Sequence, residues 1–324
     1  QAALFGEGHT TLHYKMKYNE AWRDYGIRYV TDYDAEGNEY ERRMTQAEAA
    51  NSPAAGSSGG VDPAASLVPF WQLFLYYHFV EGNTDFYPDF FEQCRLRGDT
   101  FFDHGWDFRN WSGNQGLFDK SNRDQSWAMT DFLIKISKAA GEDLSDWALR
   151  WGIPGENTNM RVSVYGQNII NTSKEMIADA VKECSVYPKP KLDPFYISDS
   201  NLDLYRNPKA IVAGTHTVEN KDGAVRVTTS GWQNVAAWVL YDPVKKRDVA
   251  CFEGRFTAFS YKEYICKYVL LPDGQTEGTR YQYCKDGYNR STENTGPIFR
   301  DDLLLYAVHP DGSRVASLSN PSQN

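Results

Sequence analysis

The most constraining feature of this sequence is a change of pattern at a short proline-rich segment, Pro188-Lys-Pro-Lys-Leu-Asp-Pro194. Before it, apolar residues recur with helical spacing; after it, short β-branched and aromatic runs alternate with turns. Proline-rich segments of this kind act as stiff connectors. A length of 324 residues allows two domains, each with its own core. We therefore predict a helical domain at residues 1–187 and a β domain at residues 195–324.

The first part of the predicted helical domain combines a short helix, a hairpin and a loop. Asn19 is a typical N-capping residue, and Gly26 follows where the short helix would end. Residues 29–33 then precede a turn signal that is typical of a hairpin. Residues 47–66 are rich in glycine, serine and alanine, so they have little apolar side chain to pack. We expect a mobile loop at residues 47–66.

The segment Leu67–Phe79 is apolar on nearly every side, which is typical of a helix buried at the centre of a domain. Pro69 would fit the first turn of this helix, where a missing N–H group has no hydrogen bond to lose. His78 is interpreted as a hydrogen-bonded residue of the core. The apolar stretch is too short for a membrane span, so we expect no transmembrane segment.

Three further helices complete the predicted domain. Residues 127–136 have apolar side chains at positions i, i+3, i+4 and i+7, and Gly141 is placed where this helix would end. Asp143 is placed to cap the short helix that follows it. Thr172 and Glu175 have the spacing of a capping box, which predicts the start of the last helix.

Residues 195–324 have the pattern of an antiparallel β domain. Short β-branched and aromatic runs lie beside four Asp-Gly turns, which are hairpin signals. The turns are Lys221-Asp-Gly223, Pro272-Asp-Gly274, Lys285-Asp-Gly287 and Pro310-Asp-Gly312. Short strands at this spacing predict a β-sandwich. The expected fold class is therefore α+β and multidomain: a helical domain followed by an antiparallel β-sandwich.

The charge of the chain limits its partners. Acidic residues outnumber basic ones by 43 to 34, and the net charge is −9. Binding to nucleic acid relies on Lys and Arg to neutralise phosphates, so we expect no nucleic-acid partner. The five cysteines lack C-x-x-C spacing, which argues against a zinc knuckle and against a dense disulfide framework.

Tyrosine and tryptophan are frequent, with 21 and 9 copies, and their flat rings with polar groups suit carbohydrate binding. The same rings also pack the cores of domains, so each candidate has two interpretations: a glycan contact or a structural residue. The candidate glycan contacts are Trp106, Arg109, Asn110, Trp111, Trp232 and Trp238.

Known catalytic and metal-binding motifs are absent from the sequence. His9 and His13 have the i, i+4 spacing of two zinc ligands, but Thr10 stands where a zincin has its glutamate base. Because a third ligand is also missing, we interpret the two histidines as an incidental pair. No G-x-S-x-G, P-loop or G-x-G-x-x-G motif occurs. We assign no catalytic and no metal-binding residue, and we expect no cofactor in this chain.

Four segments of the helical region stand in a distinctive order: Leu67-Val-Pro-Phe-Trp-Gln-Leu73, Asp85-Phe-Tyr-Pro88, Asp143-Leu-Ser-Asp-Trp147 and Arg150-Trp-Gly152. This order resembles the M60-like zinc metallopeptidases, a family that includes the enhancins and the mucin-directed proteases of gut bacteria. The resemblance covers roughly residues 1–155. It implies a helical wall beside a peptidase cleft, often with β-sandwich modules appended.

The resemblance also implies a chemistry and a setting. Family members cut proteins that bear O-linked glycans, use a zinc ion held by H-E-x-x-H and a further Glu, and are secreted or displayed on the bacterial surface. No H-E-x-x-H pentapeptide occurs in these residues, so the chain is expected to begin just after it. Zinc is then expected in the parent protein, and the missing N-terminal catalytic half becomes a partner of this chain.

Two functions remain open at this point. The first is the C-terminal part of a secreted M60-like zinc metallopeptidase acting on mucin-type glycoproteins, in which a metal-activated water attacks a peptide carbonyl. The chain alone would then be inactive. The second is a non-catalytic glycan-binding or adhesion protein on the same scaffold. Both functions predict a glycoprotein or a glycan as the ligand.

Overall fold

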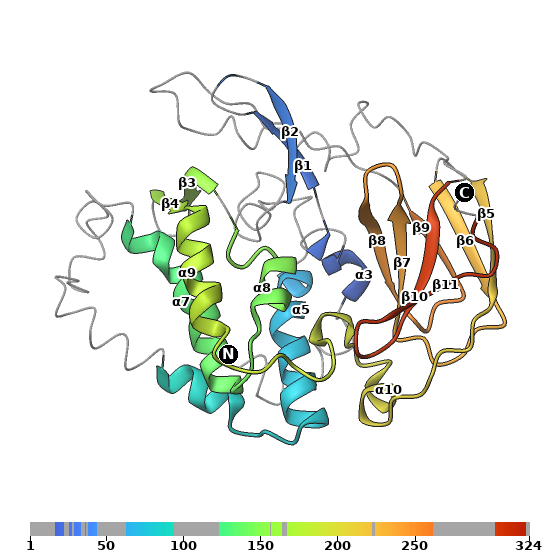
Figure 1. The fold of residues 1–324 in the computed structure, drawn as a ribbon, viewed down its shortest axis with the longest axis horizontal. Coiled ribbons are helices and arrows are strands. Elements are labelled where there is room, and N and C mark those ends of the chain that lie inside the picture. The colour runs from blue at the N-terminus through green and yellow to red at the C-terminus, as the bar shows by residue number, and fades with distance from the viewer. Residues whose placement is uncertain are drawn as a thin grey trace.

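The computed structural model describes residues 17–22, 26–27, 29–33, 36, 38–43, 63–93, 123–155, 157–163, 167–221, 224–261 and 302–321. This part of the chain contains both helices and antiparallel sheets, so the fold is α+β, as expected from the sequence. Figure 1 shows the longer helices on one side of the molecule and the two larger sheets on the other. The turns predicted at residues 272–274 and 285–287 lie outside the described residues.

The helical side begins with the short helix α3 and is built around the central helix α5. Its α-helices are α3 (Tyr18–Ala21), α5 (Pro63–Phe74), α7 (Arg123–Ala140), α8 (Ser145–Arg150) and α9 (Lys174–Cys184). A π-helical segment, η3 (Leu75–Val80), continues α5, and a further helix covers residues 86–93. Two short helices follow the proline-rich segment: η5 (Pro194–Tyr196) and α10 (Leu202–Arg206). In the described part of the chain, no helix combines the length and apolar character needed to cross a membrane.

All described strands pair in antiparallel fashion. Two hairpins accompany the helices: β1 (Tyr29–Tyr33) with β2 (Glu39–Arg43), and β3 (Asn157–Ser163) with β4 (Gln167–Thr172). One larger sheet has the order β5-β6-β9, formed by β5 (Thr215–Lys221), β6 (Ala224–Ser230) and β9 (Ala258–Tyr261). The other has the order β11-β10-β7-β8, formed by β7 (Ala237–Asp242), β8 (Arg247–Glu253), β10 (Leu304–Val308) and β11 (Arg314–Ala316). The hairpins predicted at residues 29–33, 221–223 and 310–312 are confirmed.

The central helix begins earlier than the apolar pattern indicates. It starts at Pro63 rather than Leu67, so residues 63–66 belong to α5 and not to the predicted loop. The two alanines after Pro63 favour a helix but carry little apolar surface, and apolar periodicity therefore misses this turn. Pro69 consequently lies inside the helix and not in its first turn, so that prediction was wrong.

One predicted helix end is confirmed, and another is displaced by one residue. Gly141 follows α7 with a φ of 65°, a left-handed conformation that glycine adopts readily at the end of a helix. At the start of α8 the N-capping residue is Leu144, one residue after the predicted Asp143, although the Asp143 carboxylate accepts a hydrogen bond of 2.9 Å from the Ser145 N–H. Burial opposes ionisation of Asp143, but the hydrogen bonds from Ser145 and Lys189 outweigh it and hold the pKa of this carboxyl below its ordinary value.

Two other predicted caps are wrong. Asn19 lies inside α3, and its side chain accepts a hydrogen bond of 2.9 Å from the Glu253 N–H instead. At α9 the capping residue is Ser173, whose Oγ accepts from Met176 N at 3.3 Å, while Thr172 is the last residue of β4. Where a strand runs directly into a helix, the sequence pattern predicts the first residue of the helix only to within about one residue.

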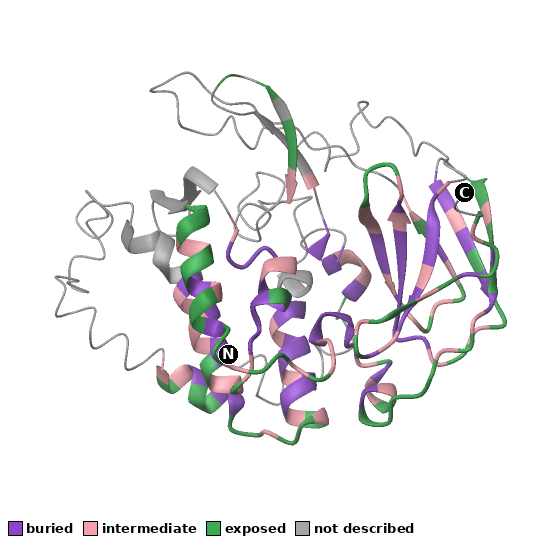
Figure 2. Cartoon of the chain, in the orientation of Figure 1, coloured by how far each residue is buried: buried purple, intermediate pink, exposed green. Residues whose placement is uncertain are grey.

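One apolar cluster extends across the predicted domain boundary. It contains Trp71 and Trp151 from the helical side, continues through Phe195 of η5, and reaches Ala237 and Val308 in the four-stranded sheet. A second cluster fills the space between the two larger sheets, with members on β6, β7, β8, β9 and β10. Figure 2 shows the buried residues concentrated in α5 and in the strands β7 and β10. The division into two domains, at residues 1–187 and 195–324, stays a prediction, because one apolar cluster contains residues from both.

The proline-rich segment is bonded to both sides of the molecule. Its first residue, Pro188, accepts a hydrogen bond of 2.7 Å from the Asp143 N–H. Near its end, Asp193 donates from its N–H to Pro310 O at 2.7 Å, and its carboxylate forms an ion pair with Arg150. The Arg150 guanidinium also lies 4.3 Å from the centre of the Phe195 ring. These contacts fix the sheets against α8.

Candidate functional site

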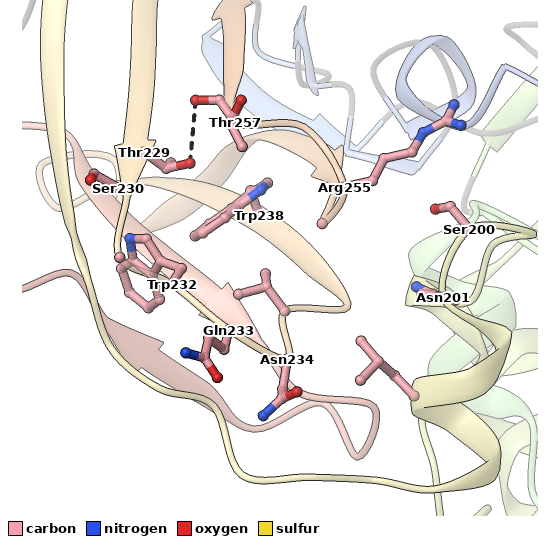
Figure 3. Close-up of a pocket in the computed structure, with 14 residues that line it drawn as sticks. Ser200, Asn201, Thr229, Ser230, Trp232, Gln233, Asn234, Trp238, Arg255 and Thr257 are labelled. Atoms are coloured by element: carbon pink, nitrogen blue, oxygen red, sulfur yellow. Dashed lines mark hydrogen bonds between the residues drawn. The ribbon is translucent and has the colours of Figure 1, made fainter.

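A pocket of about 290 Å³ lies where the larger sheets meet α10. Its walls come from residues within 200–204, 229–235 and 254–257, together with Trp238 of β7. Figure 3 shows Trp232, Gln233 and Asn234 on one side of the pocket, and Arg255, Ser200 and Asn201 on the other. Segments far apart in the sequence therefore supply opposite walls.

Two tryptophans form the aromatic part of the pocket. The rings of Trp232 and Trp238 meet edge to face, with centroids 5.1 Å apart and an interplanar angle of 86°. Trp238 is 2% exposed and donates from its indole N–H to Phe256 O at 2.9 Å, so it belongs to the core between the sheets. Trp232 is only half-buried. Of the two rings, Trp232 is the one with a face that a ligand can reach.

The loop that carries Trp232 is held by hydrogen bonds along its length. The Trp232 indole N–H donates to Thr215 O at 3.0 Å, and the Asn234 side-chain amide donates to Ala210 O at 2.8 Å. Gln233 exchanges two backbone hydrogen bonds with Val212, of 3.2 and 3.3 Å. The loop thus has a fixed shape before any ligand arrives, which lowers the entropic cost of binding.

Two glycines allow this loop to lie close to its neighbours. A Cβ atom on Gly214 would stand 2.2 Å from Ser230 O, and one on Gly254 would stand 2.0 Å from Val235 O. No side chain larger than hydrogen fits at such distances. The pocket wall therefore depends on glycine at both positions.

A buried carboxylate lies behind the opposite wall. Glu253 is 3% exposed, accepts a hydrogen bond of 2.9 Å from the Ser200 hydroxyl, and forms an ion pair of 3.1 Å with Arg255. The Arg255 side chain is 58% exposed, so its remaining N–H groups face solvent at the pocket rim. The positive charge of Arg255 at the pocket rim is therefore already balanced by the buried Glu253 carboxylate.

A second polar cluster lies next to this wall, at the junction with the helices. The Tyr18 hydroxyl donates to the Asp199 carboxylate at 2.6 Å, and the Trp71 indole N–H lies 3.3 Å from both oxygens of that carboxylate. Burial, reinforced by the neighbouring Asp199 charge, raises the pKa of Tyr18 well above its ordinary value. Tyr18 is therefore a hydrogen-bond donor that fastens α3 to the segment leading into α10.

The structure describes two of the six sequence-predicted glycan contacts, and the glycan-binding role stays a prediction for all six. Trp232 and Trp238 line the pocket, but only Trp232 offers a reachable ring, as described above. The other four candidates lie outside the described residues, and so do both histidines of the H-x-x-x-H pair; they are Trp106, Arg109, Asn110, Trp111, His9 and His13. The predicted role of these residues stays a prediction.

His78 differs from its predicted role. It is half-buried, its ring stacks on Phe74 with centroids 4.8 Å apart, and it meets Phe79 edge to face at the same distance. His78 is thus a stacked residue at the edge of the core rather than a hydrogen-bonded residue inside it. Sequence spacing could not distinguish the two, because η3 is a π-helix and rotates its side chains relative to an α-helix.

None of the polar residues of the pocket was predicted from the sequence, and these include Gln233, Asn234 and Arg255. None of them lies in a motif, and Arg255 comes from a turn more than twenty positions from Trp232. The one local signal is the Ser-Gly-Trp-Gln-Asn run at residues 230–234, since Gly and Asn favour left-handed backbone. Gly231 and Asn234 do have φ values of 78° and 61°.

The segments that carry the family resemblance meet in the core. Gln72 is fully buried; its amide donates to Phe195 O at 2.7 Å and to Ile197 O at 3.0 Å, and its Oε1 accepts from the Trp151 indole N–H at 3.1 Å. Tyr87 donates from its hydroxyl to Phe70 O. The first, second and fourth of the resembling segments are therefore joined by hydrogen bonds.

Comparisons with known proteins give a likeness in structure only. No family model matches the sequence, and no curated protein matches it. Among solved structures, a metallopeptidase from Bacteroides thetaiotaomicron matches at 20% identity and a TM-score of 0.48, over 84% of this chain and 41% of that one. A metallopeptidase in complex with Tn antigen matches at 21% identity and a TM-score of 0.48, over 84% and 45%. The M60 catalytic domain of Clostridium perfringens ZmpC, in complex with the sialyl T antigen, matches at 14% identity and a TM-score of 0.38, over 78% and 34%.

This chain is similar to M60 metallopeptidases. It spans less than half the length of the solved structures just described. The likeness concerns the outline of the fold, and any function must be argued from the chain's own residues.

Proposed function

We propose that this chain is the C-terminal part of a secreted or surface-displayed bacterial M60-like zinc metallopeptidase that acts on O-glycosylated, mucin-type proteins. The observation that carries the proposal is the hydrogen-bonded cluster around Gln72, in which segments resembling that family meet. In this proposal the helical side forms one wall of the substrate cleft, and the sheets support it.

The Gln72 cluster supports the proposal for a physical reason. A fully buried amide is costly unless each of its polar atoms has a partner, and Gln72 has three hydrogen bonds. Two of them go to η5 and its exit, and the third comes from Trp151 in the fourth resembling segment. If these short matches had arisen by chance, we would not expect their residues to be hydrogen-bonded to one another in the core.

The proposal assigns the catalytic zinc to residues outside this sequence. The 324 residues contain no H-E-x-x-H pentapeptide. In the ranges that the structure describes, no three His, Cys, Asp or Glu side chains converge as metal ligands would. These residues therefore do not fit a catalytic zinc ion, which needs about three protein ligands and a positioned base. No catalytic step is assigned to them.

Peptidase activity on matched substrates tests the proposal. The substrates are a mucin-type peptide with O-linked N-acetylgalactosamine and the same peptide without the sugar. The complete protein encoded by the gene should cleave the glycosylated peptide in a chelator-sensitive reaction, and this chain alone should cleave neither. Chelator-sensitive cleavage by this chain alone would refute the assignment of the catalytic zinc to residues outside it. An inert complete protein would refute the peptidase assignment.

A second candidate function is glycan binding without catalysis. The pocket beside Trp232 favours it, because a reachable aromatic ring lies beside exposed amide and hydroxyl groups. The complete protein also separates the two candidates. If its sequence lacks zinc ligands altogether, the glycan-binding function replaces the peptidase function.

A further inference from the structure

We propose that the pocket beside Trp232 binds one or two rings of a neutral saccharide. The proposal deepens the proposed function and rests on its glycosylated substrate, because it adds a sugar-binding subsite on the sheets. Its ligand class follows from what the pocket offers: one apolar ring face, several unused polar groups and a compensated charge.

The apolar contact is the face of Trp232. Its indole N–H is already bonded to Thr215 O, so the side chain has no further hydrogen bond to offer and presents its ring instead. Trp238 supports that ring edge-on from the core. A sugar ring carries a patch of C–H groups on one face. Such a patch packs well on an aromatic ring that a neighbouring core residue holds in place.

The polar contacts lie beside that ring. Gln233 is exposed, and its amide, which both donates and accepts, has no hydrogen bond within the described part of the chain. Ser230 adds an exposed hydroxyl. The Asn234 amide donates to Ala210 O, which leaves its carbonyl oxygen as an acceptor. Sugar hydroxyls both donate and accept, so mixed groups of this kind suit them better than a single charge does.

The charge of the pocket favours a neutral ligand over an anionic one. The exposed cation, Arg255, is paired with the buried carboxylate of Glu253 at 3.1 Å. An anionic sugar would have to compete with that fixed carboxylate, and would also approach a chain of net charge −9. A neutral hydroxyl group neither competes with the Glu253 carboxylate nor is repelled by the net negative charge. It can accept hydrogen bonds from the Arg255 N–H groups that face solvent.

The size and the fixed shape of the pocket limit the ligand to a short one. Sites for drug-sized molecules have volumes of about 300–1,000 Å³, and this pocket of about 290 Å³ is at the small end. The loop hydrogen bonds and the close approaches at Gly214 and Gly254 keep its walls in place. We therefore expect weak but selective binding of a ring or two, rather than binding of a long chain.

Saturation-transfer NMR on this chain tests the proposal, with the methyl glycosides of galactose, N-acetylgalactosamine, glucose and mannose as probes, and lactose beside sialyllactose. At least one neutral probe should bind, and sialyllactose should bind no better than lactose. Trp232→Ala should weaken binding by roughly tenfold or more, because the ring contact is lost. Phe79→Ala is the matched control: it removes an exposed ring on the helical side and should leave binding unchanged.

A second variant keeps the test decisive if Trp232→Ala disturbs folding. Gln233→Ala removes an exposed side chain and preserves the backbone bonds to Val212, so it should fold normally and weaken binding by roughly threefold. Binding to no neutral probe, preference for sialyllactose, or binding that Gln233→Ala leaves unchanged would each overturn the proposal. Cleavage by the complete protein is measured separately, so the subsite can fail while the peptidase function stands, and the reverse also holds.

Discussion

Gln72 is a fully buried polar residue near the C-terminal end of the apolar helix α5, and it holds three elements together. Its hydrogen bonds reach the carbonyl groups of Phe195 and Ile197 and the indole of Trp151. Phe195 O accepts a second hydrogen bond, from Trp22 at 3.0 Å. A residue that resembles part of a family motif therefore has a structural role here.

Replacement of Gln72 by alanine should destabilise the protein strongly. The change leaves the Trp151 indole N–H and Ile197 O unpaired in the core and opens a cavity, so we expect a loss of about 3 kcal/mol or more in the free energy of unfolding. Urea unfolding measures the loss. The same substitution at the exposed Gln233 should change stability by less than about 0.5 kcal/mol. Equal, small effects at both positions would show that the buried hydrogen bonds are dispensable.

At the scale of elements, the C-terminal segment is fastened to the strands beside it. Leu318 donates from its N–H to Gly214 O at 3.0 Å, and the Asn320 side chain exchanges two hydrogen bonds of 2.9 Å with the backbone of Leu305. The His216 ring on β5 lies 2.7 Å from the Ser317 hydroxyl. His216 is buried, and burial lowers the pKa of its imidazole below the ordinary 6.5.

The burial of His216 should make stability depend on pH in a defined direction. Because the pKa of His216 is lower in the folded state, the unfolded chain takes up a proton first as the pH falls. The stabilisation is complete above pH 6.5 and is lost as the pH falls through the folded-state pKa. The thermal midpoint should therefore drop between about pH 7 and about pH 5, and less so in His216→Gln.

The variant is needed because other groups also titrate in this range. Burial raises the pKa of the Glu142 carboxyl, which gives stability that grows as the pH falls, the opposite sign to His216. That contribution is common to both proteins and cancels in the comparison. Parallel pH profiles for the wild type and His216→Gln would exclude a role for this histidine.

The elements that sequence patterns predict well are those governed by local signals. The turn at residues 310–312 and the end of α7 at Gly141 depend on glycine, and the structure confirms them; the pairing of β5 with β6 confirms the hairpin predicted around residues 221–223. The start of α5 and the cap of α9 depend on alanine propensity and on a strand that runs into a helix, and apolar spacing misses both. Of the residues that line the pocket, the sequence singled out only Trp232 and Trp238, as candidate glycan contacts, because contacts between distant segments leave no local pattern.

At the scale of the whole molecule, the helices and the sheets share a core. The apolar cluster around Trp151 and Phe195 continues into β7 and β10, and the proline-rich segment is bonded to both sides. At the junction with η5, Arg314 forms an ion pair of 2.7 Å with Asp248 and also donates to the Tyr196 hydroxyl at 3.1 Å. The helices and the sheets therefore form one packed scaffold, and the pocket beside Trp232 lies where the sheets meet α10.

The central proposal is that this scaffold belongs to a zinc peptidase whose metal ligands lie outside these 324 residues. Zinc content, measured by mass spectrometry after dialysis, tests it most directly. The complete protein should retain roughly one zinc ion per molecule, and this chain alone should retain almost none, because a catalytic site needs about three protein ligands. Stoichiometric zinc in this chain, or a complete protein that binds none, would contradict the claim.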